Sequence, residues 1–276
     1  MHVSNKVNPE LLSHFFKMIA DGAIMESDLT EFCDNPRLWR KQVPADDSAV
    51  VTVTPNTAQP FWQGVWDELL GAGRVAVPPV PKLTKKQVKS LDRFGFMLMY
   101  LPALDEDQYP EGFAKPNWSR YLEAAKIERK PLDGMWVAVE TIRKPDFDDP
   151  TGYPDDRLMA AVKKQSRFNT SWDDLHEGGL LQKIAKAAGF PQKGTRLPTA
   201  EEWNLVGNLM NWLREHRSLP LPDLGSTRSW EWCENTCESR NRLYVGYSER
   251  GGLAYVGAGW LDHSYDNLGF RVLAVL

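Results

Sequence analysis

The chain has 276 residues, 42% of them hydrophobic, which is enough for one large domain or two smaller ones with a buried core. Its formal net charge is −4, from 33 basic and 37 acidic residues, and this balance lacks the positive field that attracts nucleic acids and anionic membranes, so we expect no nucleic-acid partner. No apolar run approaches the roughly 20 residues that span a bilayer, and the N-terminus lacks a secretory signal, which predicts a cytoplasmic protein without a membrane span.

Helical spacing of apolar residues predicts three helices in the N-terminal region, over 9–20, 27–32 and 61–70. The segment Val75-Ala-Val-Pro-Pro-Val-Pro-Lys82 follows them, and its prolines favour an extended linker. These features predict a helical region with its linker over residues 1–80 and a second domain over residues 81–276. A homo-oligomer that forms through the N-terminal region is one expectation for the assembly.

The second domain is expected to contain short strands, few helices and many loops. Aromatic and branched runs predict strands over residues 94–101 and 134–142, and a helix over 180–188 that ends at Gly189. Further strand-like runs, separated by glycine-rich and polar loops, occupy residues 242–245, 252–256 and 269–275. Seven of the eleven tryptophans lie between residues 118 and 232, and we expect most of these to pack in the core.

The cysteines are few and odd in number: Cys33, Cys233 and Cys237. Such a set fits a reducing compartment and argues against a disulfide framework. The spacing of Cys233 and Cys237 is a weak metal signal without further ligands, so we expect two plain buried or partly buried thiols. We expect no metal and no cofactor.

One segment carries both a local structural signal and a longer motif. In Arg196-Leu-Pro-Thr-Ala-Glu-Glu-Trp203, Thr199 can accept from the free amides of a helix while Glu202 reaches back to the chain before it, which is a capping box. The same string resembles the RLPTEAEW signature of the formylglycine-generating-enzyme-like superfamily. Trp230-Glu-Trp-Cys-Glu-Asn235 resembles that family's V-W-E-W segment, and Asp266-Asn-Leu-Gly-Phe-Arg-Val272 resembles its closing D-N-x-G-F-R-V.

A fourth segment, Asn169-Thr-Ser-Trp-Asp-Asp-Leu175, is similar to the family's V-S-W-x-D-A, and all four occur in the family's order. The resemblance implies an α+β, C-type-lectin-like fold with little regular secondary structure, some helices and a small antiparallel sheet. It covers roughly residues 91–276 and is firm from about residue 168, so the N-terminal helices lie outside it.

The chain departs from the enzymes of this family at the positions of their chemistry. Those enzymes carry redox-active cysteines, or metal-binding histidines, shortly before the G-F-R motif, whereas residues 246–267 contain no cysteine and only one histidine, His263. No recognised motif places a carboxylate and a nucleophile beside His263. Asp262 and Asp266 could contribute to a calcium site, but the Glu-Pro-Asn type of sugar-binding ligand set is absent, so a metal is left unassigned. We therefore predict a protein that is not an enzyme.

The segment from Leu243 to Asn267 resembles the variable repeat of proteins that are diversified by diversity-generating retroelements. In such proteins, randomised template adenines turn asparagine-type codons into other residues on the surface of a lectin fold. The residues fixed in this pattern would include Arg250, Gly251, Gly252, Leu253, Val256 and Trp260. The predicted ligand-binding, variable residues are Tyr244, Tyr247, Tyr255, Gly257, Ala258, Gly259, Asp262, His263, Ser264 and Tyr265. Their mixture of Tyr, Ser, Gly, Asp and His is typical of a paratope.

Three functions stay open from the sequence. The first and preferred one is a ligand-binding protein whose diversified surface contacts a protein or other macromolecule. The second is an oxidoreductase of the formylglycine-generating or sulfoxide-forming branch, and the third is a phage-related structural or assembly protein whose N-terminal helices oligomerise. Display on a cell surface or a phage stays open as the alternative to the cytoplasmic location. Glycine, tyrosine and serine are also common in ordinary exposed loops, so the segment alone does not decide between them.

Overall fold

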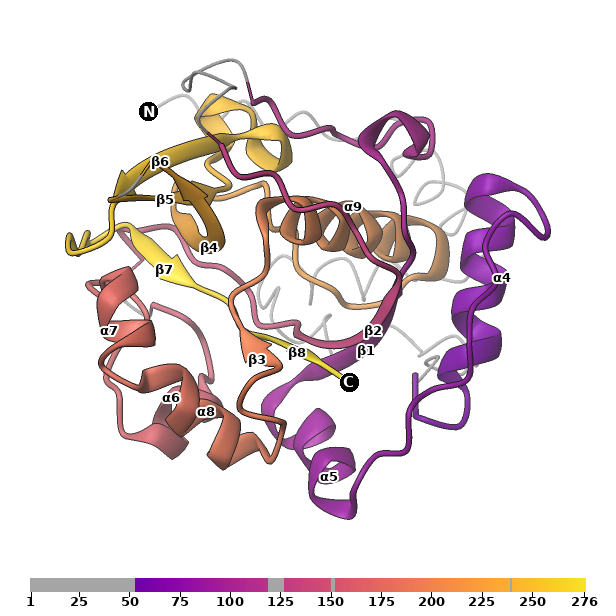
Figure 1. Ribbon diagram of the computed structural model, residues 1–276, viewed down its shortest axis with the longest axis horizontal. Helices are drawn as coiled ribbons and strands as arrows, with labels where there is room; N and C mark the ends of the chain where they lie inside the picture. Colours follow the sequence, from indigo (N-terminus) through magenta and orange to yellow (C-terminus); the bar gives the residue numbers. More distant parts are fainter. Residues whose placement is uncertain (1–52, 119–126, 150–151, 239) are drawn as a thin grey trace, which may run out of the picture. The chain divides into compact units, whose positions relative to one another are not determined.

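The computed structural model describes residues 53–118, 127–149, 152–238 and 240–276 (Figure 1). They belong to one unit that extends from Thr52 to Leu276. The helices predicted over 9–20 and 27–32, together with Cys33, lie outside the described residues. Within the described ranges, no helix is long and apolar enough to cross a membrane.

The described chain mixes helices with short strands, so the predicted α+β class is confirmed. Its helices are α4 (Ala58–Leu70), α5 (Lys85–Phe94), α6 (Arg157–Val162), α7 (Trp172–His176), α8 (Leu180–Ala188) and α9 (Ala200–Arg217). Its strands are β1 (Phe96–Leu101), β2 (Met135–Glu140), β3 (Thr195–Arg196), β4 (Trp230–Cys237), β5 (Asn241–Val245), β6 (Val256–Trp260), β7 (Leu268–Phe270) and β8 (Leu273–Val275). Single turns of 3-10 helix occur at η1 (Glu106–Gln108), η3 (Ser248–Arg250) and η4 (Gly252–Ala254).

The strands described form two four-stranded sheets. In the first, with strand order β1-β2-β8-β3, all neighbours are antiparallel. In the second, with order β6-β5-β4-β7, the β4 and β7 pair is parallel and the others are antiparallel. Helix α9 contacts β1 of the first sheet and β4 and β5 of the second (Figure 1). Two small sheets with few helices are consistent with the predicted C-type-lectin-like architecture.

Helix α4 packs on the first sheet. The indole of Trp62 donates a hydrogen bond to the Leu98 carbonyl at 2.7 Å, and that of Trp66 donates to the Tyr100 carbonyl at 3.1 Å. Both indoles are fully buried. The unit from Thr52 to Leu276 thus includes α4, which these two tryptophans attach to β1. The proline-rich segment contains neither helix nor strand, as predicted.

Local sequence signals account for most helix ends. Gly189 ends α8 in the left-handed conformation at φ 75°, as predicted, and the predicted capping box begins α9. The strand predicted from residue 94 begins at Phe96 instead, because α5 continues to Phe94 and Gly95 ends it at φ 67°. The strand predicted over residues 252–256 is wrong, since 252–254 form a 3-10 turn and β6 begins at Val256.

The capping box at the start of α9 is formed by Thr199 and Glu202. The Thr199 side chain accepts from the Glu202 amide at 3.1 Å, and Glu202 accepts from the Thr199 amide at 2.7 Å. Thr199→Ala is expected to lower the free energy of unfolding by about 1–2 kcal/mol, because a buried helix amide loses its acceptor. Ser264→Ala, which removes an exposed loop hydroxyl, is the control and is expected to change stability by less than about 0.5 kcal/mol in urea unfolding. Equal losses of stability in the two variants would show that the Thr199 side chain does not stabilise the start of α9.

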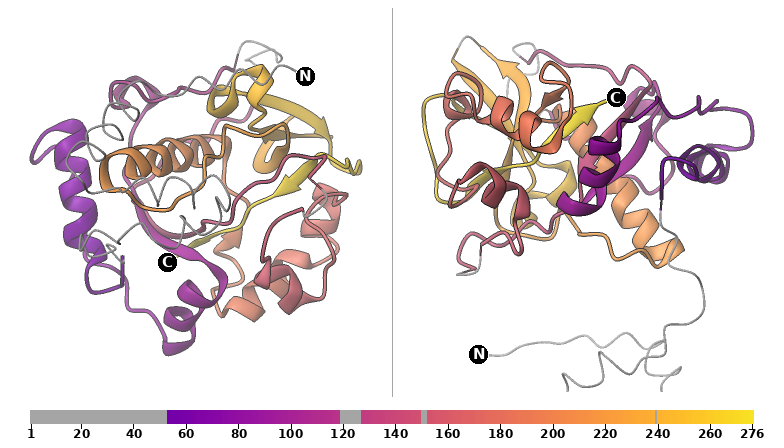
Figure 2. Two further views of the ribbon diagram at one scale, coloured as in Figure 1. Left: turned by 180° about the vertical axis from the view of Figure 1, so that it is seen from behind. Right: turned by 90° about the horizontal axis from the view of Figure 1, so that it is seen from below.

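Most of the tryptophans expected in the core are there. Of the seven between residues 118 and 232, those that are buried are Trp118, Trp136, Trp203 and Trp232. In both views of Figure 2, β6 and β7 lie on the side of the unit away from α4. The segment predicted to bind ligand is therefore carried at the opposite end from the first described helix.

Candidate functional site

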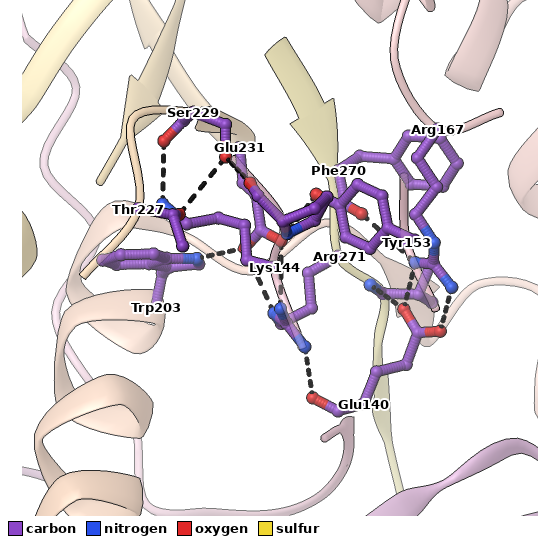
Figure 3. Close-up of polar contacts among 12 residues, drawn as sticks. Glu140, Lys144, Tyr153, Arg167, Trp203, Thr227, Ser229, Glu231, Phe270 and Arg271 are labelled. Carbon is purple, nitrogen blue, oxygen red and sulfur yellow. Dashed lines mark hydrogen bonds and ion pairs between the residues drawn. The ribbon is translucent and has the colours of Figure 1, made fainter. Parts of the chain in front are cut away.

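The second sheet is fixed by a buried network in which three of the predicted motifs meet (Figure 3). Glu231 of the W-E-W segment accepts two hydrogen bonds from Arg271 of the G-F-R segment, at 3.0 and 3.1 Å. Its carboxylate also accepts from the Trp203 indole at 2.6 Å and from the Tyr153 hydroxyl at 3.0 Å. Burial raises the pKa of Glu231, but the charges of Arg271 and Lys144 outweigh it, so the pKa lies below its ordinary value.

A second ion pair continues this network into the first sheet. Arg167 donates to both carboxylate oxygens of Glu140, at 2.6 and 2.7 Å, and Arg271 donates to the Glu140 carbonyl at 2.7 Å. The Glu140 carboxylate also accepts from the Val272 amide at 2.7 Å. The side chains of Glu140 and Arg167 are almost completely buried. The pairs thus connect β2, β4 and the link between β7 and β8.

The fourth motif packs against the same strand. The Trp232 indole donates to the Thr170 carbonyl at 2.9 Å, and the Trp172 indole donates to the Cys233 carbonyl at 3.2 Å. Ser171 forms the capping box of α7 with Asp174. All four segments of the family resemblance are therefore neighbours around β4, although they are separate in the sequence.

Lys144 is fully buried beside this network, and its ammonium donates to the Ser229 carbonyl at 2.8 Å. Burial lowers its pKa to about 8, although Glu231 opposes this shift. Because the unfolded chain then holds this proton to a higher pH than the folded chain, stability rises with pH above about 8.

We predict that the free energy of unfolding of wild type rises by about 1.4 kcal/mol per pH unit relative to Lys144→Met between pH 8 and 10, as measured in denaturant titrations. A difference that does not change with pH would contradict a proton-linked role for Lys144.

A cluster of aromatic rings covers one face of the second sheet. The ring of Trp230 stacks on Tyr247 with centroids 4.6 Å apart, and its centroid lies 5.4 Å from Tyr244 and 6.5 Å from Tyr255. Tyr244 also meets Trp232 edge to face at 6.1 Å. Burial, and then the neighbouring Tyr255, raise the pKa of Tyr244. These three tyrosines are thus parts of one packed cluster rather than separate surface residues.

The glycines of β6 are complementary to this cluster. Gly257 pairs with Tyr244 across the strands, and a Cβ at Gly257 would lie 2.5 Å from the Tyr244 ring and 2.8 Å from the Tyr255 hydroxyl. A Cβ at Gly259 would lie 3.2 Å from the Tyr244 ring. Ala258 pairs with Leu243, on the other face of the strand. The size of residue 257 is therefore coupled to the ring at 244.

Tyr247 has a backbone conformation that tyrosine rarely adopts, with φ 138° and ψ 104°. We predict that Tyr247→Gly is more stable than Tyr247→Ala by about 1–3 kcal/mol, because both variants lose the ring and only glycine relieves the backbone strain. Thermal or urea unfolding of the two variants measures this difference directly. If alanine is as stable as glycine, the backbone at this position is not strained.

The rest of the predicted segment forms an exposed loop between β6 and β7. Trp260 is 52% exposed and stacks on His263 with centroids 5.5 Å apart, while Tyr265 is 37% exposed and meets His263 edge to face at 5.9 Å. The Arg240 guanidinium lies 5.7 Å from the centre of the Trp260 ring and pairs with Asp262 at 3.2 Å. We call Arg240, Trp260, His263 and Tyr265 the exposed aromatic strip.

The loop is held to its neighbours by main-chain hydrogen bonds. The Asn169 amide donates to the Tyr265 carbonyl at 3.0 Å, and the Asp173 amide donates to the Leu261 carbonyl at 3.1 Å. The Leu261 amide in turn donates to the Arg240 carbonyl at 3.1 Å. These bonds do not depend on the side chains of residues 262–265, so the same loop can carry other residues there.

No protein-family model and no curated protein matches this sequence. The solved structures that are similar to it include the following three. Treponema denticola variable protein 1 has a TM-score of 0.37 at 9% identity, with 65% of this chain and 95% of that chain covered. The crystal structure of CarF has a TM-score of 0.35 at 13% identity, with 54% and 89% covered. PvdO from Pseudomonas aeruginosa has a TM-score of 0.31 at 11% identity, with 66% and 92% covered.

The structure divides the predicted binding residues into two groups. Tyr244 and Tyr247 are half-buried in the aromatic cluster, and Tyr255, Gly257 and Gly259 are buried, so those three offer little surface to a large ligand. Ala258 is half-buried, on the opposite face. The exposed group consists of Asp262, His263, Ser264 and Tyr265.

Sequence reasoning missed two members of the exposed aromatic strip. The sequence pattern places Trp260 in the fixed scaffold, although it is the most exposed large hydrophobic residue among those described. Arg240 lies before the predicted segment and is exposed. Nothing in the sequence marks Arg240, but a tryptophan next to a polar loop is a signal that could have identified Trp260.

The two described cysteines are buried free thiols, as predicted. Burial raises the pKa of the Cys233 thiol well above its ordinary value, which disfavours the reactive thiolate. No group of three or more metal-binding side chains suited to a metal ion occurs among the described residues. His263 lies 4.0 Å from Asp262 and within 3.1 Å of the Tyr265 hydroxyl, on an exposed loop.

Proposed function

We propose that this protein binds a macromolecular ligand, with the exposed aromatic strip at the centre of the contact, and that it makes and breaks no bond. The proposal rests on the grouping of three exposed residues: Trp260 at the end of β6, Tyr265 in the loop that follows, and Arg240 between β4 and β5, next to the Trp260 ring. Tryptophan, tyrosine and arginine are the residues that dominate binding energy at protein interfaces. The proposed partner is a protein or another macromolecule other than nucleic acid.

The way the loop is held supports this function. Its main chain is fixed by Asn169, Asp173 and Arg240, and its rings stack on one another, so little side-chain freedom remains to be lost on binding. A paratope of this kind gains affinity from rigid aromatic contact area.

The proposed function includes diversification of the segment from Leu243 to Asn267, as in the variable repeats that it resembles. Residues 262–265 are exposed and their loop is held through its main chain, so changes there leave the core intact. Residue 257, in contrast, can enlarge only when the ring at 244 becomes smaller and the Tyr255 hydroxyl moves away. We therefore propose that the exposed residues vary independently, while residues 244 and 257 vary together.

Site-specific cross-linking tests the binding surface. p-Benzoylphenylalanine in place of Tyr265 is expected to give an adduct of one defined mass on irradiation in the native cells. The same photoreactive residue in place of Val88, which is 40% exposed on α5, is the matched control and is expected to give none. The absence of an adduct at Tyr265, or the same adduct at both positions, would overturn the proposed surface.

A further inference from the structure

A second candidate site lies away from the exposed aromatic strip. A cavity of about 430 Å³ opens between the segment that follows β1, residues 129–132 and the first turn of α9. Its lining includes Tyr109 and Glu201, with Asp105, Glu106 and Arg129. This volume is within the range of roughly 300–1,000 Å³ that small-molecule sites occupy.

Tyr109 has an unsatisfied polar group in this lining. The residue is 8% exposed, and its hydroxyl is buried without a hydrogen-bond partner in the described structure. Buried hydroxyls are nearly always paired, because an unpaired one loses its hydration without compensation. A ligand that donates a hydrogen bond to the Tyr109 oxygen would lower this cost.

The charge of the lining indicates the chemistry of such a ligand. Three carboxylates, those of Asp105, Glu106 and Glu201, line the cavity with one guanidinium, that of Arg129, which already pairs with Glu106. The carboxylate of Asp107, also in the lining, is fully exposed and pairs with Lys115 at 3.7 Å. Glu201 is 4% exposed and accepts hydrogen bonds from the Lys130 amide and the Asn235 side chain, both at 2.9 Å.

Neither of these donors to Glu201 carries a charge at the bonding atom. Burial therefore raises the pKa of Glu201 despite its hydrogen bonds, and burial together with the charges of Glu106 and Glu201 also raises that of Tyr109. A cation in the cavity would stabilise the ionised form of Glu201. Glu201 also departs from the RLPTEAEW signature, which has alanine at this position, so the charge is a feature of this chain.

From this geometry we infer that the cavity binds the ammonium group of an organic amine, with Glu201 as its ionised partner and the Tyr109 hydroxyl oxygen as an acceptor. An ammonium group has three donors, which suits a site with several acceptors. A bare metal ion is a poorer fit, because the described residues hold no group of three or more side chains that could coordinate one. The amine can come from a free small molecule or from a lysine side chain.

Calorimetric titration of the full chain with two probes tests this inference. Cadaverine represents a free amine, and Nα-acetyl-lysine methylamide represents a lysine side chain. Binding of either probe supports the site and shows which source of the amine it accepts. Glu201→Gln is expected to weaken binding about tenfold or more, because the ion pair is lost. Glu249→Gln, the same change at an exposed residue outside the cavity, is the control and is expected to leave the affinity unchanged.

The variant Tyr109→Phe tests the amine site without the risk that the protein fails to fold. It removes a hydroxyl that has no partner among the described residues, so the thermal midpoint is expected to stay the same or rise, while amine affinity falls by about threefold to tenfold. The inference is overturned if neither probe binds at millimolar concentration, or if Glu201→Gln binds as tightly as Glu249→Gln. Trp260→Ala is expected to leave amine binding unchanged, so failure here is distinct from failure of the proposed macromolecular surface.

Discussion

Glu231→Gln is expected to lower the free energy of unfolding by about 3–5 kcal/mol, because it leaves the buried Arg271 guanidinium without its counter-charge. Glu231 and Arg271 are both fully buried, and their two hydrogen bonds hold β4 to the turn after β7. Urea unfolding measures the loss. Arg271→Met is expected to cost less in the Glu231→Gln background than alone, since the two residues act as a pair.

The matched control for this substitution is Glu249→Gln, which removes the same charge from an exposed position and is expected to change stability by less than about 0.5 kcal/mol.

The contribution of Glu231 to stability also depends on pH. Its folded pKa lies below the ordinary value of 4.5, so its stabilisation is present above that pH and is lost as the pH falls through the folded pKa. The gap between wild type and Glu231→Gln should therefore narrow in acid. A small loss that is independent of pH would show that the pair does not fix the sheet.

Trp260→Ala is the second large effect, and it is expected on binding rather than on stability. Removing a central aromatic residue from an interface costs about 2 kcal/mol or more, which is roughly a 30-fold loss of affinity. The ring is 52% exposed, so the free energy of unfolding should change by less than about 0.5 kcal/mol. The measurement is the yield of the photo-adduct from residue 265 as a function of protein concentration.

Val88→Ala provides the comparison for that experiment, because Val88 is an exposed hydrophobic residue on α5, outside the strip. It should leave the adduct yield unchanged. If Trp260→Ala also leaves the yield unchanged, the strip is not the centre of the contact. If it unfolds the protein instead, the tryptophan is a structural residue, as the sequence suggested.

The sequence predicted the fold class because its signals are local or occur in a fixed order. Helix α9 follows from the pairing of Thr199 with Glu202, and α8 ends where Gly189 permits a left-handed turn. The four ordered motifs indicated the lectin-like fold. However, their order does not reveal that Glu231 and Arg271 form a buried pair, since that contact depends on how the sheet is assembled.

Two elements differ from the prediction for physical reasons: helix α5 and the 3-10 turn at residues 252–254. Helix α5 was missed although Thr84 and Gln87 form a capping box, because the apolar run after it dominated the pattern. The strand expected over residues 252–256 is replaced by a 3-10 turn, because Gly251 and Gly252 adopt φ values of 126° and 56°.

Exposure in the candidate site was the hardest feature to predict. Tyr255 and Gly257 have the residue types of a variable surface, but rings from β4 and β5 cover them. A single sequence does not show which strand covers which. The loop residues from Asp262 to Tyr265 were easier, since a polar run between two strands is usually exposed.

Sequencing the DNA around the gene of this protein tests whether its binding surface is diversified. We expect a nearby reverse-transcriptase gene and a near-copy of the segment encoding residues 243–267, which differs from it at template adenines. Those differences should include the codons for residues 262–265. A locus without such a copy, or a copy whose differences are unrelated to adenines, would show that the surface is not diversified in this way.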